Sequence, residues 1–344
     1  MKFSFETLEL KTHQPFGIAR WTHSSYPRTF VTLEHGGFTG RGEAAPNAFY
    51  GETRGTVEAV LPVLLEKITD PWDWEALEHN FQSTFPHGHP SVKCALEMAV
   101  VEWCAMSVNL PVWQMLGLSA ARIPESSFTV SLAALETMRE NAARAVLEGY
   151  GTLKVKLGTA QDVSILETLR EAAPKAKIRV DANAAWTRAQ AKRMLDVLEQ
   201  MDVELLEQPL ASEDLEGHLE LRRIAKIPIF ADESLHSRSS VPNLAHSFDG
   251  INLKIQKLGG PLQALHTLRT ARALGLSVML GCMIESSLGI AASAHLAGLA
   301  DFTDLDGATL LEHDPYTGLT WKAGVLERPM GAGWGVERRN SNEQ

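Results

Sequence analysis

The sequence predicts an α/β protein: a closed TIM-like (β/α) barrel of eight parallel strands, joined to a separate α+β domain. The main observation is a rhythm from about residue 125 onward, where short runs rich in valine and isoleucine alternate with stretches of helical periodicity. Eight such runs, spaced about 25 residues apart, fit a barrel better than an open doubly wound sheet. No GxGxxG or P-loop pattern follows any of these runs, so a nucleotide cofactor is not indicated.

The strands of the predicted barrel follow one another at regular intervals. In order along the chain they cover residues 127–131, 152–157, 177–183, 203–208, 227–233, 250–255, 276–281 and 302–306. One intervening helix opens with a capping-box pattern from Thr187 to Gln190. The apolar stretch 275–298 is long enough to span a membrane, but Glu285 and His295 within it favour a buried strand followed by a helix.

Three segments are expected along the chain. Residues 1–123 contain alternating strands, glycine-rich turns and then helices, which predicts an α+β domain. Residues 124–314 hold the barrel, and residues 315–344 form a glycine-rich segment that is not another βα repeat.

Composition excludes several classes of function. The 344-residue chain is 44% hydrophobic, the level of a globular protein with a sizeable core. Its net charge of −10 contains no long run of one sign, so neither a nucleic-acid surface nor a basic membrane-binding helix is expected. The first residues, MKFSFETLELK, lack the apolar core of a secretory signal, which predicts a cytoplasmic protein.

Polar residues stand at the ends of the predicted strands, where buried strands should be apolar. The intervals from Lys156 to the next such residues are 25, 26, 25 and 22 positions, about one βα unit each. All should therefore project toward the C-terminal mouth of the barrel, where barrel enzymes keep their active sites. The set comprises Lys154, Lys156, Asp181, Asn183, Glu207, Asp232, Lys254, Asp304 and Asp306.

Three of these residues predict a metal site. Asp181, Glu207 and Asp232 come from successive strands, and three converging carboxylates repel one another unless a cation lies among them. Because the ligands are all hard oxygens, Mg²⁺ or Mn²⁺ is favoured over Zn²⁺. The alternative is that each acid caps the following helix, which is reasonable for one residue and weak for three in register.

The lysines predict acid–base chemistry. Lys154 and Lys156 share one face of a strand, and each ammonium group disfavours protonation of the other, so one of them could act as a base. Lys254 should lie across the barrel, which places a lysine on each side of a bound carbon. Lys257, three residues further on, is expected to point away to solvent. Solvated lysines on an exposed edge strand are the alternative interpretation.

Taken together, the motifs resemble the enolase superfamily, in its muconate-lactonizing subgroup, and most closely the dipeptide epimerases. The matching segments are KxK at 154–156, DAN at 181–183, EQP at 207–209, ADES at 231–234 and NLKIQKLGG at 252–260. The resemblance implies a (β/α)7β barrel with an α+β capping domain formed from both termini. It also implies that the three acids bind Mg²⁺, that Lys156 and Lys254 transfer protons, and that Lys154 tunes Lys156.

The resemblance extends to the substrate. Segments like the DLDG that contains Asp304 and Asp306 hold the free ammonium group of a dipeptide, although these residues could also form a simple turn. Arg20 is expected to pair with a glutamate side chain, which makes L-Ala-D/L-Glu, a cell-wall peptide fragment, the leading substrate. Tyr50, Glu52 and Glu285 are weaker candidates for the pocket.

Other functions remain open at this point. An N-acylamino acid racemase or an o-succinylbenzoate synthase would use the same lysines and metal, but their substrates carry no free ammonium group. Muconate cycloisomerase is disfavoured for the same reason. A metal-binding barrel without catalytic activity would not need two lysine bases. The resemblance also leads us to expect a homo-oligomer.

Overall fold

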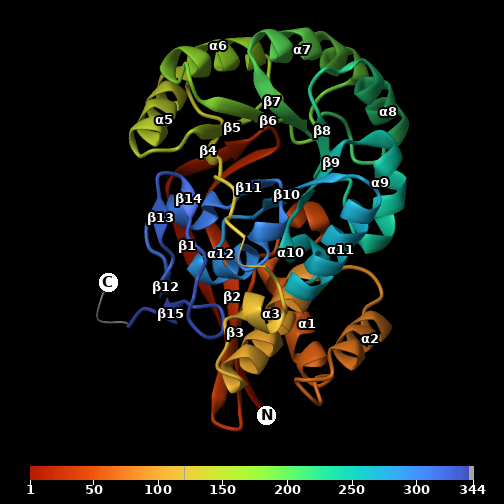
Figure 1. Ribbon diagram of the computed structural model, residues 1–344, viewed down its shortest axis with the longest axis vertical. Helices are drawn as coiled ribbons and strands as arrows, with labels where there is room; N and C mark the ends of the chain where they lie inside the picture. Colours follow the sequence, from red (N-terminus) through yellow and green to blue (C-terminus); the bar gives the residue numbers. More distant parts are fainter. Residues whose placement is uncertain (120, 341–344) are drawn as a thin grey trace.

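The computed structural model describes residues 1–119 and 121–340, so residue 120 and the last four residues of the predicted C-terminal segment lie outside the described part. Figure 1 shows a barrel at one end of the molecule and a capping domain at the other. The predicted fold class is confirmed, whereas the segment boundaries at residues 123 and 314 stay predictions.

The barrel is a single sheet of eight parallel strands whose neighbours follow the order of the chain. A parallel bridge between Ser126 and Thr303 brings the first and last strands together and closes the barrel. The strands are β4 (Phe128–Val130), β5 (Thr152–Lys156), β6 (Lys177–Asp181), β7 (Val203–Glu207), β8 (Ile229–Ala231), β9 (Gly250–Leu253), β10 (Ser277–Gly281) and β11 (Phe302–Asp304).

Helices connect these strands on the outside of the barrel. Figure 1 shows four of these helices, at residues 135–147, 162–172, 188–200 and 215–224, as an arc around the sheet. After β11 the chain continues into the 3-10 helix η4 (Asp306–Leu310) rather than an α-helix, which gives the (β/α)7β pattern. The barrel helices are α5 (Leu135–Leu147), α6 (Asp162–Ala172), α7 (Arg188–Gln200), α8 (Leu215–Ile224), α9 (Val241–Ser247), α10 (Ile255–Leu258), α11 (Pro261–Ala273) and α12 (Ser287–Ala294).

Local sequence signals explain several of these elements. The capping box expected at Thr187 and Gln190 is present at the start of α7. The apolar stretch 275–298 forms β10 and α12, as predicted. Among the described residues, no helix is long and apolar enough to span a bilayer. Inside the barrel, Phe230 packs edge to face against Phe302, and a side chain at Gly250 would overlap with the ring of Phe230.

The capping domain begins with an antiparallel sheet in the order β1 (Lys2–Ile18), β2 (Trp21–His35), β3 (Phe38–Ala44). Gly40 and Gly42 let the helix at residues 90–107 lie directly on β3, because a Cβ atom at either position would overlap with carbonyl oxygens of that helix. The short 3-10 helix η1 (Ala48–Tyr50) follows the sheet. The remaining helices of the domain are α1 (Arg54–Leu65), α2 (Trp74–Thr84), α3 (Pro90–Ser107) and α4 (Val112–Met115).

The C-terminal segment returns to the capping domain. It contains two small antiparallel pairs, β12 (Tyr316–Thr317) with β15 (Glu337–Arg338) and β13 (Trp321–Lys322) with β14 (Val325–Leu326). Trp334 is fully buried, and its indole N–H donates to the carbonyl oxygen of Arg41 on β3. Both ends of the chain therefore contribute to the cap, as the resemblance implied.

Candidate active site

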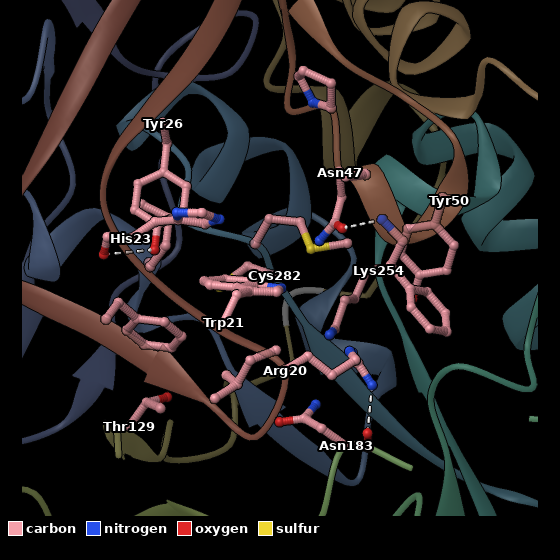
Figure 2. Close-up of a pocket in the computed structure, with 18 of the residues that line it drawn as sticks. Arg20, Trp21, His23, Tyr26, Asn47, Tyr50, Thr129, Asn183, Lys254 and Cys282 are labelled. Atoms are coloured by element: carbon pink, nitrogen blue, oxygen red, sulfur yellow. Dashed lines mark hydrogen bonds between the residues drawn. The ribbon is translucent and has the colours of Figure 1, made fainter. Parts of the chain in front are cut away.

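A cavity of about 630 Å³ lies between the mouth of the barrel and the capping domain. The barrel contributes charged groups from the ends of its strands, whereas the cap contributes mainly aromatic and apolar side chains from the β1–β2 hairpin and η1. Figure 2 shows side chains from both parts facing one another across this space. The volume suits a small organic molecule that is largely enclosed when bound.

Three buried carboxylates form a cluster at the mouth. Asp181, Glu207 and Asp232 each offer an oxygen within 4.8 Å of the others, and we call these residues the carboxylate cluster. Direct pairing of Asp181 with Glu207 across β6 and β7 fixes the register of the first two. Burial and the charge of Asp181 raise the pKa of Glu207 to about 7. Burial alone would raise the pKa of Asp181 as well, but Lys156 and Lys154 hold it at about 2.

The carboxylate cluster fits a hard divalent cation. Glu207 Oε2 is buried and forms an ion pair with Lys154 Nζ at 2.7 Å. Two buried oxygens beside the cluster, Asn183 Oδ1 and Glu233 Oε2, have no hydrogen-bond partner. Buried polar atoms are rarely left unpaired, so the orphaned oxygens and the all-oxygen donor set are what a site for such a cation requires.

The two predicted bases flank the carboxylate cluster. Lys156 Nζ, at the end of β5, donates to Asp181 Oδ2 at 2.7 Å. Lys254 Nζ, directly after β9, donates to Asp232 Oδ2 at 2.7 Å. Both side chains line the cavity and are about nine-tenths buried. Because the cluster comes from the strands between β5 and β9, the two ammonium groups approach it from opposite sides.

Lys154 lies deeper than Lys156, with a side chain that is 1% exposed. Its Nζ donates to Asp304 Oδ2 at 2.8 Å and lies 3.4 Å from Asp181 Oδ2. Burial opposes its charge, but Asp304, Glu207 and Asp181 together raise the pKa of Lys154 well above its ordinary value. This lysine therefore remains positively charged near Lys156, and its tuning role stays a prediction.

The glycine two residues after Lys156 is required by its backbone conformation and by its neighbours. Gly158 has a φ of +104°, a region that favours glycine. A Cβ atom there would lie 2.5 Å from the Cβ of Ala185 and 2.9 Å from that of Ala19. Gly158 thus lets both the β1–β2 hairpin and the segment after β6 approach the backbone just after β5.

The expectation that Lys257 points to solvent is wrong. Its side chain is 1% exposed, and Nζ donates to Asp232 Oδ1 at 2.6 Å and to the Asp232 carbonyl oxygen at 2.7 Å. The strand was predicted to continue to residue 255, but β9 ends at Leu253 and α10 begins at Ile255. Within a helical turn, residues three positions apart return to the same side, so Lys257 follows Lys254 inward.

Asp304 and Asp306 both line the cavity and are buried. Asp304 Oδ1 accepts from Ser127 Oγ at 2.6 Å, whereas Asp306 Oδ2 accepts from the backbone N–H of Thr129 at 2.6 Å. Burial and the charge of Asp304 raise the pKa of Asp306 to about 7. Asp306 does open η4, so part of the turn alternative is correct, but its carboxylate faces the cavity all the same.

The capping residues predicted for the pocket have mixed positions. Arg20 and Tyr50 line the cavity, and burial raises the pKa of Tyr50 well above its usual value. Glu52 also lines it, but its carboxylate accepts hydrogen bonds from the backbone N–H and hydroxyl of Ser91 at the start of α3.

Glu285 lies outside the residues that line the cavity. It is fully buried, where it accepts from the backbone N–H of Met283 at 2.7 Å and from Gln256 Nε2 at 3.1 Å. The segment after β10 turns this side chain toward the cap interior, so the structure does not support the prediction that Glu285 binds substrate.

Sequence reasoning missed most of the apolar lining. The segment PFGIARW was expected from the resemblance to reach over the substrate, and the aromatic residues at 16, 21 and 26 are the signal that could have added them to the lining. The missed residues include Phe16, Trp21, His23, Tyr26, Phe49, Met283 and Leu310, together with Thr129 at the end of β4.

A closed parallel barrel with acids on three neighbouring strands and a cap built from both termini defines the class of capped (β/α)7β barrel proteins. Comparison with known proteins gives the family. Residues 4–117 match the mandelate racemase / muconate lactonizing enzyme N-terminal domain, and residues 137–342 match the enolase C-terminal domain-like family. The chain belongs to the enolase superfamily, in the group of mandelate racemase and muconate lactonizing enzymes.

Dipeptide epimerases are prominent among its relatives. A hydrophobic dipeptide epimerase of Roseobacter litoralis is 34% identical over 94% of this chain and 95% of its own. The L-Ala-D/L-Glu epimerase of Bacillus subtilis, solved with substrate, has a TM-score of 0.93 and 29% identity over 98% of both chains. The dipeptide epimerase of Enterococcus faecalis, complexed with Mg and L-Leu-L-Tyr, has a TM-score of 0.93 and 30% identity over 98% of this chain and 99% of its own.

A relative of different specificity is equally similar in fold. The N-succinyl Arg/Lys racemase of Bacillus cereus has a TM-score of 0.94 and 26% identity over 98% of this chain and 96% of its own. Overall similarity therefore identifies the scaffold, and the choice of reaction has to come from side chains in the cavity.

Proposed function

We propose that this protein is a divalent-cation-dependent epimerase of dipeptides, which inverts the α-carbon of the second residue by transfer of a proton. The observation that supports this most strongly is the position of Lys156 and Lys254 on opposite sides of the carboxylate cluster. Two bases on opposite faces of one carbon are what inversion requires, because the proton leaves from one face and returns to the other.

The residues divide this reaction as follows. One lysine, neutral at that moment, takes the α-proton, and the substrate becomes an enediolate. The other lysine, protonated, then gives a proton to the opposite face of the same carbon. A divalent cation held by the carboxylate cluster, Mg²⁺ by preference and Mn²⁺ as the alternative, would stabilise the negative charge that develops on the substrate carboxylate.

Asp304 and Asp306 favour a dipeptide over an N-acylated amino acid. Both carboxylates line the cavity at the end of β11, and because Asp304 is already paired with Lys154, a free ammonium group bound nearby would offset the charge of Asp306. An N-acylamino acid racemase or an o-succinylbenzoate synthase acts on a substrate without that group, so two carboxylates there would lack a cationic partner on the substrate. This assignment of the pair rests on its chemistry and its place in the cavity.

The particular dipeptide is a further part of the proposal. L-Ala-D/L-Glu is the candidate from the sequence, and it would connect the protein to cell-wall peptide breakdown in the cytoplasm. Relatives with names for hydrophobic dipeptides support the alternative of an apolar second residue. We also propose, from the same family resemblance, that the protein forms a homo-oligomer.

Proton exchange tests the function directly. Incubation of L-Ala-L-Glu and L-Ala-L-Leu with the protein and Mg²⁺ in D₂O should place deuterium at the second α-carbon, measured by mass spectrometry. Removal of the cation with EDTA should abolish exchange, and N-acetylated dipeptides should exchange far more slowly. If no dipeptide of a small library exchanged its α-proton, the proposal would be contradicted for every choice of the second residue.

A further inference from the structure

The tip of the β1–β2 hairpin, residues 16–26, is fastened to the barrel at several points, and we call it the hairpin tip. The carbonyl oxygen of Gly17 accepts from the backbone N–H of Leu132 at 2.9 Å, and Ala19 approaches Gly158 closely above β5. A side chain at Gly17 would overlap with the carbonyl oxygen of Leu132. The hairpin tip therefore packs in a defined position against the rim of the barrel.

Arg20 makes the most extensive of these attachments. Its Nη2 lies 2.8 Å from Glu233 Oε1, and its Nη1 donates to the carbonyl oxygen of Asn183. Glu233 directly follows a member of the carboxylate cluster, and Asn183 lies two residues after another. The guanidinium of Arg20 also lies 4.4 Å from the centre of the Phe49 ring. Figure 2 shows Arg20 extended toward Asn183.

The strength of this tie follows from the burial of its acceptor. The Glu233 side chain is 2% exposed, and removing the cationic partner of a buried carboxylate is costly. The Arg20 side chain is 31% exposed, so it bridges the buried acid and the cavity. A substrate carboxylate would have to compete with Glu233 for the same guanidinium.

The other two arginines that line the cavity are also engaged. Arg28 is buried and donates to the carbonyl oxygens of Ile284 at 2.6 Å and Pro27 at 2.7 Å. Arg54 pairs with Glu58 at 2.7 Å on the same helix. Each arginine around the cavity thus already has a protein acceptor.

Besides these arginines, aromatic side chains of the hairpin tip line the cavity. The rings of Trp21 and His23 stack with centroids 4.8 Å apart, and Trp21 lies 6.2 Å from Tyr26 and 6.4 Å from Phe16. Figure 2 shows Trp21, His23 and Tyr26 grouped together in the cavity. Such a wall favours apolar and aromatic groups, and it offers little compensation to a desolvated carboxylate.

We propose that Arg20 is a positioning residue that ties the hairpin tip to the metal-binding strand ends, and that the cavity consequently selects dipeptides with an apolar second side chain. This inference rests on the proposed function and deepens it. It replaces the expected role of Arg20 as the group that binds a glutamate side chain, because the geometry commits its guanidinium to Glu233.

Substrate preference is the first part of the test. The wild-type protein should act on L-Ala-L-Phe and L-Ala-L-Leu with a kcat/KM at least about 10-fold above that for L-Ala-L-Glu, because the charged side chain has to be desolvated without a free partner. In Arg20→Met and in Glu233→Gln, KM should rise by a similar factor for all three substrates.

A double-mutant cycle and limited proteolysis distinguish an ion pair that holds the hairpin tip on the barrel from a direct contact between Arg20 and the substrate. The double variant Arg20→Met/Glu233→Gln should be little worse than either single variant, because both remove the same ion pair. Limited chymotrypsin digestion, which cuts after aromatic residues, should cleave the hairpin tip faster in both single variants. Arg54→Met is the matched control: this residue also lines the cavity, but it pairs with Glu58 on its own helix and with Glu9 on β1, both outside the hairpin tip, so the rate of cleavage in the hairpin tip should not change.

The outcomes distinguish this inference from the proposed function. A loss in Arg20→Met confined to L-Ala-L-Glu, or a wild-type preference for that substrate, would overturn the inference while the epimerase assignment stands. An unchanged rate of digestion in both single variants would show that Arg20 and Glu233 do not hold the hairpin tip on the barrel. This result does not depend on whether any substrate is turned over. No proton exchange with any dipeptide would refute the proposed function itself.

Discussion

The barrel mouth and the hairpin tip line the same cavity, but they direct their charged side chains differently. At the mouth, Lys156 and Lys254 extend into the cavity beside the carboxylate cluster. In the hairpin tip, Arg20 is turned to Glu233, and aromatic rings are left to face the cavity. This contrast teaches that one part of the site supplies proton transfer while the other supplies shape, so substitutions in the two parts should affect different kinetic quantities.

The largest effect is expected at the two lysines. Lys156→Ala and Lys254→Ala should each lower the rate of epimerisation by about a thousandfold or more, in the upper range for general acid–base groups. Each variant keeps a lysine on one face, so each should still exchange the proton of one stereoisomer in D₂O.

Lys192→Ala is the control for these variants, since Lys192 forms an exposed ion pair with Glu220 away from the cavity lining. Equal residual exchange of both stereoisomers by either variant would refute the assignment of one lysine to each face. The barrel mouth would then no longer be assigned as the part of the site that transfers protons, which is one side of its contrast with the hairpin tip.

A smaller effect is expected at the end of β11. Asp306→Asn should lower kcat/KM for dipeptides by about 10- to 100-fold, the usual cost of losing a hydrogen bond between charged groups. N-acetylated substrates should be affected little, because they carry no ammonium group. Asp304→Asn should be at least as severe, since this carboxylate also accepts from Lys154. An equal loss for free and acetylated substrates would contradict ammonium binding.

The same residue predicts a pH dependence. Burial and the charge of Asp304 raise the pKa of Asp306 to about 7, so its carboxyl is ionised above that pH and protonated below it. A neutral carboxyl attracts an ammonium group weakly, so kcat/KM for dipeptides should fall as the pH falls through about 7. In Asp306→Asn this decrease should be absent from the pH profile, and its persistence would assign the titration to another group.

The smallest effect is expected at Lys257, which resembles Arg20 in that its charge is committed to the protein. Lys257 holds Asp232 Oδ1 and leaves Oδ2 on the side of Lys254. Lys257→Met should therefore weaken Mg²⁺ binding about 10-fold, the order of loss found when a group that orients a metal ligand is removed. Isothermal titration calorimetry measures this without any substrate. An affinity equal to that of a Lys192→Met control would show that Asp232 needs no such support.

The extent to which the sequence predicts this site follows the same division. Lys156 and Asp181 could be placed because neighbouring parallel strands of regular length keep residues one βα unit apart at the same height. Lys257 could not be placed correctly, because the start of α10 reverses the alternation expected of a strand. The GG that ends the short α10, with positive φ at both glycines, is a signal for a helix end that could have corrected the error.

The remaining residues depend on contacts between distant segments. Arg20 meets Asn183 and Glu233 across more than 160 residues of sequence, and no local pattern reports such a pairing. The position of Glu285 similarly depends on the direction of one segment after β10, where a bend moves the side chain from the cavity into the cap. Residues on the strands and within two positions of their ends could therefore be placed, whereas the contacts of residues farther along the connections could not.

The burial of Trp334 has a consequence for how the molecule is assembled during synthesis. Its indole bonds to Arg41, and its backbone N–H donates to Glu102, whose carboxylate also pairs with Arg41. A nascent chain that has already formed β1 to β3 still exposes this seat until residue 334 leaves the ribosome. The cap is thus completed only when this last segment joins it, and a truncation before Trp334 should leave Arg41 and Glu102 without this partner.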